Sequence, residues 1–240
     1  MKIDPELCIA CEVCLPYCPM EAISMKDDMA VIDEDECVEC GVCLRAEVCP
    51  VDAFVEETHD WPRSVRVAFS NPLTVHKETR VPGRGTEEAK TTDVTGRFRR
   101  GLVGVTAEMG RPGVGVRFYD VEKVAQALAK TGVEFADDNP VTHLMVDKST
   151  GKLNSEVLNE KVCSAMVESI TRVDNIPTVI KALKEVASQI ETVFTLTIST
   201  KLEADGSALC EKPLDELKVP LYINGKVNVG LGRPLFKEES

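Results

Sequence analysis

Eight of the ten cysteines of this 240-residue chain form two short runs near the N-terminus. The first run is Cys8, Cys11, Cys14 and Cys18, and the second is Cys37, Cys40, Cys43 and Cys49; a proline follows each run. Within each run two residues separate the first three cysteines. Three thiolates at that spacing can wrap one corner of an iron–sulfur cubane, because the tight turns direct successive sulfurs at neighbouring irons. The runs therefore predict two [4Fe-4S] clusters.

The fourth cysteine of each run lies too far along the chain to close the cluster that its own run begins. We expect it to reach across to the other cluster. The predicted ligands of cluster one are Cys8, Cys11, Cys14 and Cys49, and those of cluster two are Cys37, Cys40, Cys43 and Cys18. Zinc has no use for a third closely spaced cysteine, and disulfides need an oxidising compartment, for which the chain shows no export signal.

The two runs are an internal duplication. The first three cysteines repeat at an offset of 29 residues, and the similarity continues past them, where Pro19–Ile23 parallels Pro50–Phe54. On these motifs, residues 1–57 resemble bacterial-type dicluster ferredoxins. The resemblance implies a compact pseudo-twofold βαββαβ unit whose clusters lie near enough for electrons to tunnel between them.

Two features depart from that family. Five residues separate Cys43 from Cys49 where the family usually has three, and Glu12 replaces a glycine often found after the second cysteine. The longer spacing lies in the segment that delivers Cys49 to cluster one. We therefore expect a lengthened turn or short helix there, and cluster one as the less regular site.

The net negative charge lies entirely in the cysteine-rich segment. Residues 1–58 hold fifteen acidic and three basic side chains, which leaves 40 − 15 = 25 acidic and 28 − 3 = 25 basic side chains in the remainder. This balance argues against nucleic acid and favours a redox partner or catalytic subunit with a basic docking face, although acidic residues also serve solubility alone. No apolar run is long enough to form a membrane helix, and no signal peptide is evident. We therefore expect no membrane insertion and a cytoplasmic location.

After residue 58 the composition changes, and we expect three parts: a ferredoxin domain at 1–58, a basic connecting segment at 59–100, and an α+β domain of unknown role at 101–240. Val65–Phe69 is typical of a short strand. Residues 77–100 carry seven cations against four acids. They predict a solvated loop, a segment docked on an acidic surface such as the chain's own ferredoxin unit, or a cradle for an anion.

The last part alternates between strand and helix periodicity. We expect strands at 102–109, 141–146, 162–171 and 192–199, a helix at 121–129 capped by Asp120, and a helix at 177–190 capped by Asp174 or Asn175. Two βαβ units in series predict a ferredoxin-like α+β sandwich, the plan also used by ACT-type ligand domains. Asn224-Gly225 predicts a hairpin turn.

No catalytic residue can be named from the sequence. The three histidines are dispersed, Cys163 is typical of a small buried hydrophobe inside a strand, and Cys210 of a free thiol in a connecting segment. Whether the chain is an enzyme is open, and any catalysis would have to come from a cofactor.

Three functions fit these observations. The first is an electron-transfer protein or subunit that relays low-potential single electrons to or from a partner oxidoreductase, as in anaerobic metabolism. The second is a ferredoxin-fused reductase: the order of ferredoxin unit, residues 84–90 and the closing Gly230–Pro234 resembles 6-hydroxynicotinate reductase-like iron–sulfur proteins, which implies an unsaturated or N-heteroaromatic substrate. The third is a redox- or ligand-sensing module built on the ACT-like half.

Overall fold

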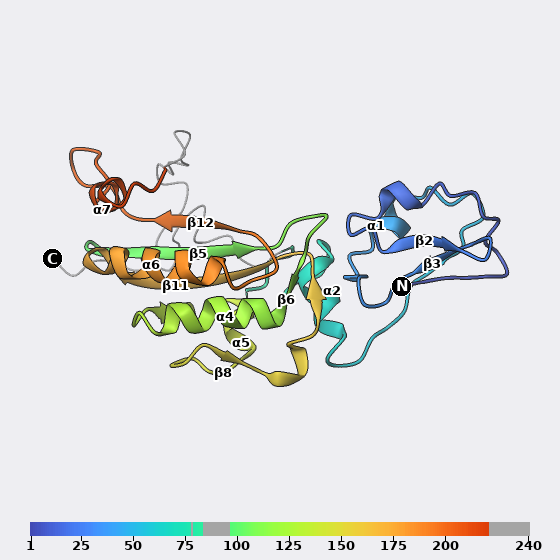
Figure 1. Cartoon of the computed structure of the whole chain (residues 1–240), viewed down its shortest axis with the longest axis horizontal. Helices are drawn as coiled ribbons and strands as arrows, with labels where there is room; N and C mark the ends of the chain where they lie inside the picture. Colours follow the sequence, from blue (N-terminus) through green and yellow to red (C-terminus); the bar gives the residue numbers. More distant parts are fainter. Residues whose placement is uncertain (78, 84–96, 221–240) are drawn as a thin grey trace.

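The computed structural model describes residues 1–77, 79–83 and 97–220, which form a small N-terminal unit and a larger α+β unit (Figure 1). Helix α2 (Ser64–Ser70) lies between the two units. The predicted hairpin at Asn224-Gly225 and the segments 84–90 and 230–234 lie outside the described residues.

The N-terminal unit is built from short elements around its cysteines. Strand β1 (Lys2–Ile3) pairs antiparallel with β4 (Phe54–Val55), and β2 (Ile23–Lys26) forms a hairpin with β3 (Met29–Ile32). A 3₁₀ turn, η1 (Leu15–Tyr17), follows the first cysteines, and helix α1 (Val42–Arg45) spans the equivalent place in the second run. Only small clusters of buried residues hold these elements together, which is too little core for independent stability.

The larger unit contains a four-stranded sheet in the spatial order β12-β5-β11-β7, in which every neighbouring pair is antiparallel. Its strands are β5 (Leu102–Met109), β7 (Glu134–Phe135), β11 (Ala165–Arg172) and β12 (Phe194–Ser199). Helix α4 (Phe118–Ala129) connects β5 to β7, and α6 (Ile176–Ala187) connects β11 to β12. The chain is therefore α+β, with two βαβ connections in series; its likeness to ACT domains stays a prediction.

The main core lies between this sheet and the two helices. Val103, Val105 and Ala107, on one face of β5, are fully buried there, and Thr106 and Glu108 on its other face are buried as well. Val121, Val124 and Leu128 of α4 come at the helical spacing that the sequence shows and are also fully buried. This packing fixes the end of the sheet that faces the N-terminal unit.

The prediction of a strand at Val65–Phe69 is wrong, because these residues form α2. Val65 and Phe69 are four residues apart, so a helix places both on one face, and both are buried in the main core. The Phe69 ring meets the ring of Phe118 edge-on, with 5.2 Å between centroids. A five-residue apolar run does not distinguish these two outcomes by periodicity.

Asp120 does not cap its helix, which begins two residues earlier, at Phe118. Its carboxylate is buried inside the first turn, where it accepts hydrogen bonds from Lys123 Nζ at 2.8 Å and from the backbone nitrogen of Glu191 at 3.0 Å. Asn175 precedes α6 without a side-chain cap, because its amide donates to Thr131 and Thr171 instead. That helix ends at Ala187 rather than at 190.

The strand predicted at 141–146 is wrong for its first half. Residues Pro140–His143 form helix α5, and only β8 (Met145–Asp147) is extended. Asn139 explains the difference, since its Oδ1 accepts a hydrogen bond from the Val141 nitrogen at 2.8 Å and caps the helix. The strand expected at 162–171 is interrupted at Cys163-Ser164, between β10 (Lys161–Val162) and β11.

The remaining elements are peripheral. They are β6 (Val116–Arg117), which pairs with β10, β9 (Lys152–Leu153), which pairs with β8, the 3₁₀ turns η2 (Ser155–Val157) and η3 (Val173–Asn175), and helix α7 (Glu211–Glu216). Turns lie at residues 112–114 and 204–205. No helix among the described residues is long and apolar enough to cross a membrane.

One buried guanidinium joins the two units. Arg66 of α2 is 4% exposed, and its terminal nitrogen donates to the backbone carbonyls of Glu34, Asp35 and Cys37 at 2.8, 3.1 and 2.8 Å. Its Nε forms an ion pair with Glu160 of the α+β unit. Arg66 therefore holds the chain around the second cysteine run against the larger unit.

Further contacts lie beside Arg66. Glu36 forms ion pairs with Arg117, at 3.0 Å, and with Lys161. The hydrogen bond from Lys161, together with the two positive charges, holds the pKa of Glu36 below its usual range. The Gly113 nitrogen donates to the Pro19 carbonyl at 2.5 Å. The acidic stretch at 33–36 is therefore docked on cations of the same chain.

Replacing Arg66 by alanine removes the hydrogen-bond donor of three carbonyls and leaves Glu160 without its cation. We expect Arg66→Ala to lower the free energy of unfolding by about 3 kcal/mol, because one partner of a buried ion pair is lost. Anaerobic urea unfolding measures this. Arg172→Ala is the matched control, since its pair with Asp174 is exposed and contributes less than about 1 kcal/mol. Equal losses in the two variants would contradict the assignment.

Candidate iron–sulfur centres

Two cavities in the N-terminal unit each gather four cysteines. The first cavity is lined by Cys8, Cys11, Cys14 and Cys49, together with Ile3, Ile9 and Phe54. The second is lined by Cys37, Cys40, Cys43 and Cys18, together with Met20, Ala22 and Val38. Each cavity thus takes three cysteines from one run and the fourth from the other. This grouping is the one expected for cluster one and cluster two, and the assignment of each sulfur to iron stays a prediction.

The backbone around the two cavities repeats as the sequence does. Ala10 and Glu39, 29 residues apart, both have left-handed backbones, with φ of 55° and 56°. Glu12 and Gly41 are the next such pair, with φ of 60° and 68°. The position that Glu12 occupies therefore needs the left-handed region, which explains why glycine suits it. These turns direct successive cysteines of a run into one cavity.

Each fourth cysteine accepts a hydrogen bond from the backbone four residues later. The Ala22 nitrogen lies 3.2 Å from Cys18 Sγ, and the Ala53 nitrogen lies 3.3 Å from Cys49 Sγ. Hydrogen bonds to a ligating sulfur stabilise its negative charge and are one of the factors that set the potential of a cluster. Both alanines are buried, so these donors are shielded from water.

The two extra residues before Cys49 are accommodated by α1. The first run has the three-residue η1 at the equivalent place, and the second has the four-residue α1 followed by a left-handed Glu47 with φ of 51°. Arg45 of α1 donates to the Cys40 carbonyl at 2.7 Å. The lengthened segment therefore delivers Cys49 to the first cavity and also contacts the second.

The thiols of the second cavity are strongly desolvated. Burial, with the negative charge of Glu39 adding to it, raises the pKa of Cys37 to about 11. Burial, with the neighbouring Cys40 and Cys37 adding to it, raises the pKa of Cys43 to about 12. Burial likewise raises the pKa of Cys40 and of Cys14. Iron binds these sulfurs as thiolates, so cluster binding displaces their protons. The negative charge that remains on the buried sulfurs must be compensated by the metal. An iron–sulfur cluster, rich in positive iron, suits this donor set.

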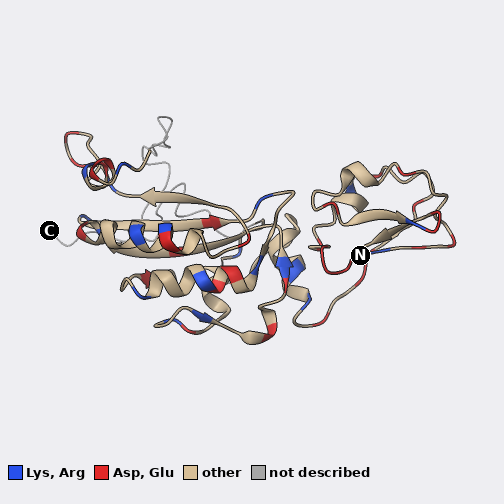
Figure 2. Cartoon of the chain, in the orientation of Figure 1, with Lys and Arg blue, Asp and Glu red and all other residues tan. Residues whose placement is uncertain are grey.

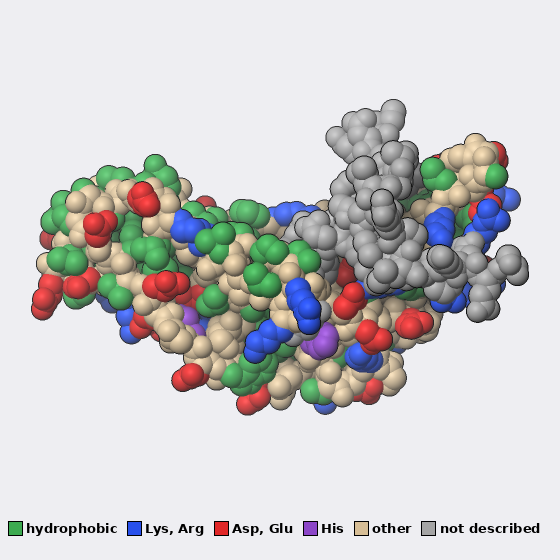
Figure 3. Space-filling model, turned by 180° about the vertical axis from the view of Figure 1, so that it is seen from behind, with side chains coloured by type: hydrophobic (Ala, Val, Ile, Leu, Met, Phe, Trp, Pro, Cys, Tyr) green, Lys and Arg blue, Asp and Glu red, His purple; other side chains and the backbone are tan. Residues whose placement is uncertain are grey.

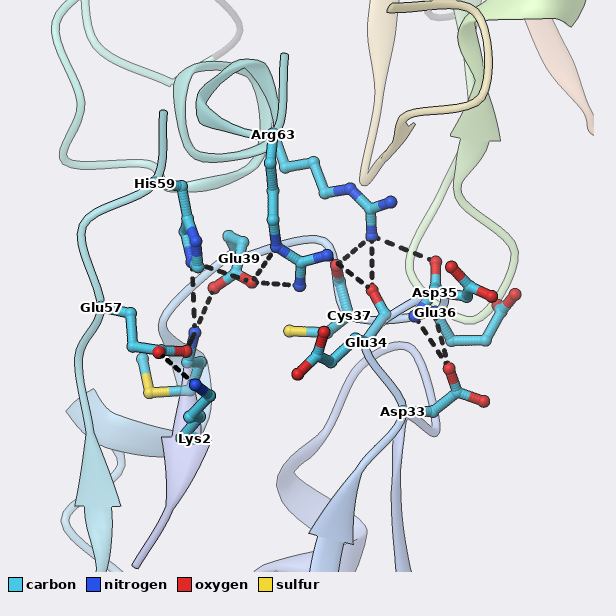
Figure 4. A network of polar contacts seen from close by, with 12 residues as sticks. Lys2, Asp33, Glu34, Asp35, Glu36, Cys37, Glu39, Glu57, His59 and Arg63 are labelled. Atoms are coloured by element: carbon cyan, nitrogen blue, oxygen red, sulfur yellow. Dashed lines mark hydrogen bonds and ion pairs between the residues drawn. The ribbon is translucent and has the colours of Figure 1, made fainter. Parts of the chain in front are cut away.

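A buried carboxylate lies within the second cysteine run (Figure 4). Glu39 accepts from the Met1 amino group at 2.7 Å and from Arg63 at 2.6 Å, and His59 lies 3.2 Å away. Burial acts to raise the pKa of Glu39, but the hydrogen bonds from the amino group and Arg63 outweigh it and hold the pKa below its usual range. The network ties Cys37–Cys40 to the segment that leads into α2.

The two cavities differ in what surrounds them. Cys11 and Ile9 of the first cavity are exposed, Ile9 by 60%. Beside the second cavity Met20, Ala22 and Val38 are buried, and Cys163 of the α+β unit packs against this group. Met20 also contacts Gly115, where an added Cβ would lie 2.8 Å from the Met20 methyl. The second cavity therefore faces the α+β unit, and the first cavity faces outward.

The structural positions of several cysteines and arginines were not evident from the sequence. Cys163 lies between β10 and β11, partly buried at the junction of the units rather than inside a strand. Cys210 is buried at the start of α7, where burial raises its pKa. Arg66 belongs to the segment predicted as a strand and Arg63 lies just before it; their spacing of three residues would have been informative had the helix been recognised. Among the described residues no three His, Cys, Asp or Glu side chains are placed to hold a single metal ion.

A protein with this fold and these paired cysteine cavities is an iron–sulfur electron-transfer protein with two [4Fe-4S] clusters. Comparison with known proteins agrees. The family model of the 4Fe-4S dicluster domain matches residues 7–53. Ferredoxin-1 of Rhodobacter capsulatus is 38% identical over 71 residues, which cover 30% of this chain and 86% of that protein. The chain belongs to the ferredoxin family through this N-terminal domain.

Two further relatives extend the comparison. Ferredoxin Fdx2 of Sorangium cellulosum is 34% identical over 98 residues, covering 40% of this chain and 94% of that protein. An uncharacterized ferredoxin-like protein of Haemophilus influenzae is 38% identical over 80 residues, covering 28% of this chain and 91% of that protein. These similarities cover well under half of the chain.

The crosswise assignment predicts which pairs of substitutions act on the same cluster. Cys11→Ala and Cys49→Ala should each lower bound iron from about eight to about four per chain, and the double variant should keep about four, because both residues serve cluster one. Combining Cys49→Ala with Cys40→Ala should remove both clusters. Iron analysis and low-temperature EPR of anaerobically prepared protein measure this. Loss of all iron in the first double variant would contradict the assignment.

Proposed function

We propose that the chain relays single electrons through its two clusters between an external redox protein and its own α+β unit. When bound, the clusters supply reversible one-electron chemistry at low potential. The observation that carries the proposal is the placement of one cysteine cavity at the outer surface and the other against the larger unit. In this scheme the eight cysteines hold the clusters, and residues 59–240 complete or dock onto a catalytic centre.

The contacts at the junction support a fixed relay rather than a loosely tethered one. Arg66, Arg117 and Lys161 bond to residues of the acidic segment beside the second cavity. Because Val65 and Phe69 of α2 are buried in the core of the α+β unit, we propose that α2 is part of that unit and that the ferredoxin domain ends near residue 58. Electron transfer across this junction then needs no diffusional encounter.

The proposal predicts that the protein takes up two electrons per chain. Anaerobic reductive titration should bleach the iron–sulfur absorption in step with about two equivalents, and the EPR of the fully reduced protein should show coupling between two nearby paramagnets. Protein that carries fewer than about six irons, or that gives no reducible signal, would contradict the relay.

A second candidate is a reductase whose substrate binds in the α+β unit. The contact of Met20 and Cys163 at the junction favours it, because electrons that reach cluster two are delivered to that unit. Such an enzyme would reduce an unsaturated or N-heteroaromatic compound. A bound flavin or other organic chromophore in the purified protein would support this candidate, whereas iron as the only chromophore and a stoichiometric partner in anaerobic co-purification would favour a subunit.

A sensing role for the α+β unit stays a prediction. Its strand and helix order is that of two βαβ connections, and fold alone does not specify a ligand. Thermal-shift screening with amino acids and nucleotides tests it, since a specific ligand raises the melting temperature.

A further inference from the structure

The acidic residues of the ferredoxin unit fall into two groups. Two of those near the second cavity are paired within the chain, Glu36 with Arg117 and Lys161 and Glu39 with Arg63, whereas Asp33, Glu34 and Asp35 are exposed and have no ion pair within the described residues. The charges that meet Glu36 and Glu39 come from the α+β unit and the segment leading to it. The chain thus supplies the basic docking surface for its own cluster two (Figure 2).

The acidic residues around the first cavity are different. Glu12 lines that cavity, Glu6 precedes its first cysteine by two residues, and Asp52 lies between two of its lining residues. All three are exposed, and within the described part of the chain no ion pair involves any of them. Carboxylates without an ion pair within the described residues therefore surround the outward cavity.

An apolar surface accompanies this charge. Leu7, Ile9 and Val13 alternate with the cysteines of the first run and are 45%, 60% and 45% exposed. Figure 3 shows hydrophobic and acidic side chains together over the end of the ferredoxin unit away from the α+β unit. An apolar centre with a charged rim is the composition of a protein interface. No hydrogen bond within the described residues joins the lining of the first cavity to residues beyond 59.

We propose that the surface formed by Glu6, Leu7, Ile9, Glu12, Val13 and Asp52 is the docking site for the chain's external redox partner. This inference rests on the proposed relay function. The partner is a one-electron redox protein that presents an apolar patch around its cofactor, ringed by lysine and arginine. Its basic rim meets the free carboxylates, and its apolar centre covers Ile9 beside the exposed Cys11. Cluster one is the port of exchange, and cluster two serves the α+β unit alone.

The electron balance at this port is simple. The reduced centre at cluster one loses one electron, the partner's oxidised cofactor gains it, and no proton or bond change is required. Oppositely charged surfaces raise the rate of encounter and are screened by salt. The exchange should therefore slow as ionic strength rises.

Cytochrome c, a basic one-electron haem protein, is the probe. We compare the complete wild-type chain with the double variant Glu6→Lys/Glu12→Lys and with Glu185→Lys, an exposed position on α6. At low salt the affinity of the double variant for cytochrome c, and the rate at which it reduces cytochrome c, should each be at least about tenfold lower than in the wild type. Both quantities should then depend little on salt. Glu185→Lys should match the wild type. Carbodiimide cross-links to cytochrome c lysines should map to Glu6, Glu12 or Asp52.

The outcomes separate this inference from the relay itself. Loss of iron or of the reducible EPR signals in the wild type would overturn the relay. A wild type that keeps both signals but does not bind cytochrome c at low salt would overturn the docking surface. The docking surface would also be overturned if the double variant behaved like Glu185→Lys, or if the cross-links mapped to Asp33, Glu34 and Asp35. Iron content confirms that each variant is folded and loaded.

Discussion

The N-terminal unit is too small to be held by apolar burial. Its buried groups, such as Cys14 with Ile23 and Ala30, amount to one layer of side chains between the cysteine cavities. Metal–sulfur bonds must therefore supply most of its cohesion, as in other small metal-binding domains. The backbone follows from this requirement: left-handed residues lie between the first three cysteines of each run, short strands lie at the rim, and backbone amides donate to the sulfur of each fourth cysteine. The α+β unit, with its continuous core, then supplies the rigid support that the smaller unit lacks.

The asymmetry between the two cavities arises at that support. An internal duplication would give two equivalent sites, and the local backbones remain equivalent, as Glu12 and Gly41 show. Docking breaks the equivalence: one cavity is covered by Met20, Cys163 and the turn at Gly115, while the other keeps Cys11 and Ile9 in solvent. Solvent access and nearby charge both influence cluster potentials, so two similar ligand sets acquire different environments. A difference in environment between the two sites is therefore a direct result of docking a symmetric unit at one end.

Much of the site could be predicted because cysteine spacing states its chemistry directly. The strands at 102–109 and 192–199 and the amphipathic helices were also legible, since their apolar residues recur at fixed periods. The junction was not. Val65 and Phe69 form a run that fits either period, and only the main core, assembled from distant residues, selects the helix that aims Arg66 at the ferredoxin unit. Charge counting located the acidic segment correctly but could not show which carboxylates are already paired within the chain.

The way Arg66 holds the second cysteine run has a consequence for how such a chain can change. Three of its hydrogen bonds go to backbone carbonyls, which every residue type possesses, rather than to the side chains of Glu34, Asp35 or Cys37. Docking therefore depends on the path of the loop more than on its composition. The side chains of Glu34 and Asp35 are not fixed by this contact, and a foreign dicluster unit with the same loop path would satisfy the same guanidinium. Such an exchange would still need a carboxylate at the place of Glu36 to meet Arg117 and Lys161.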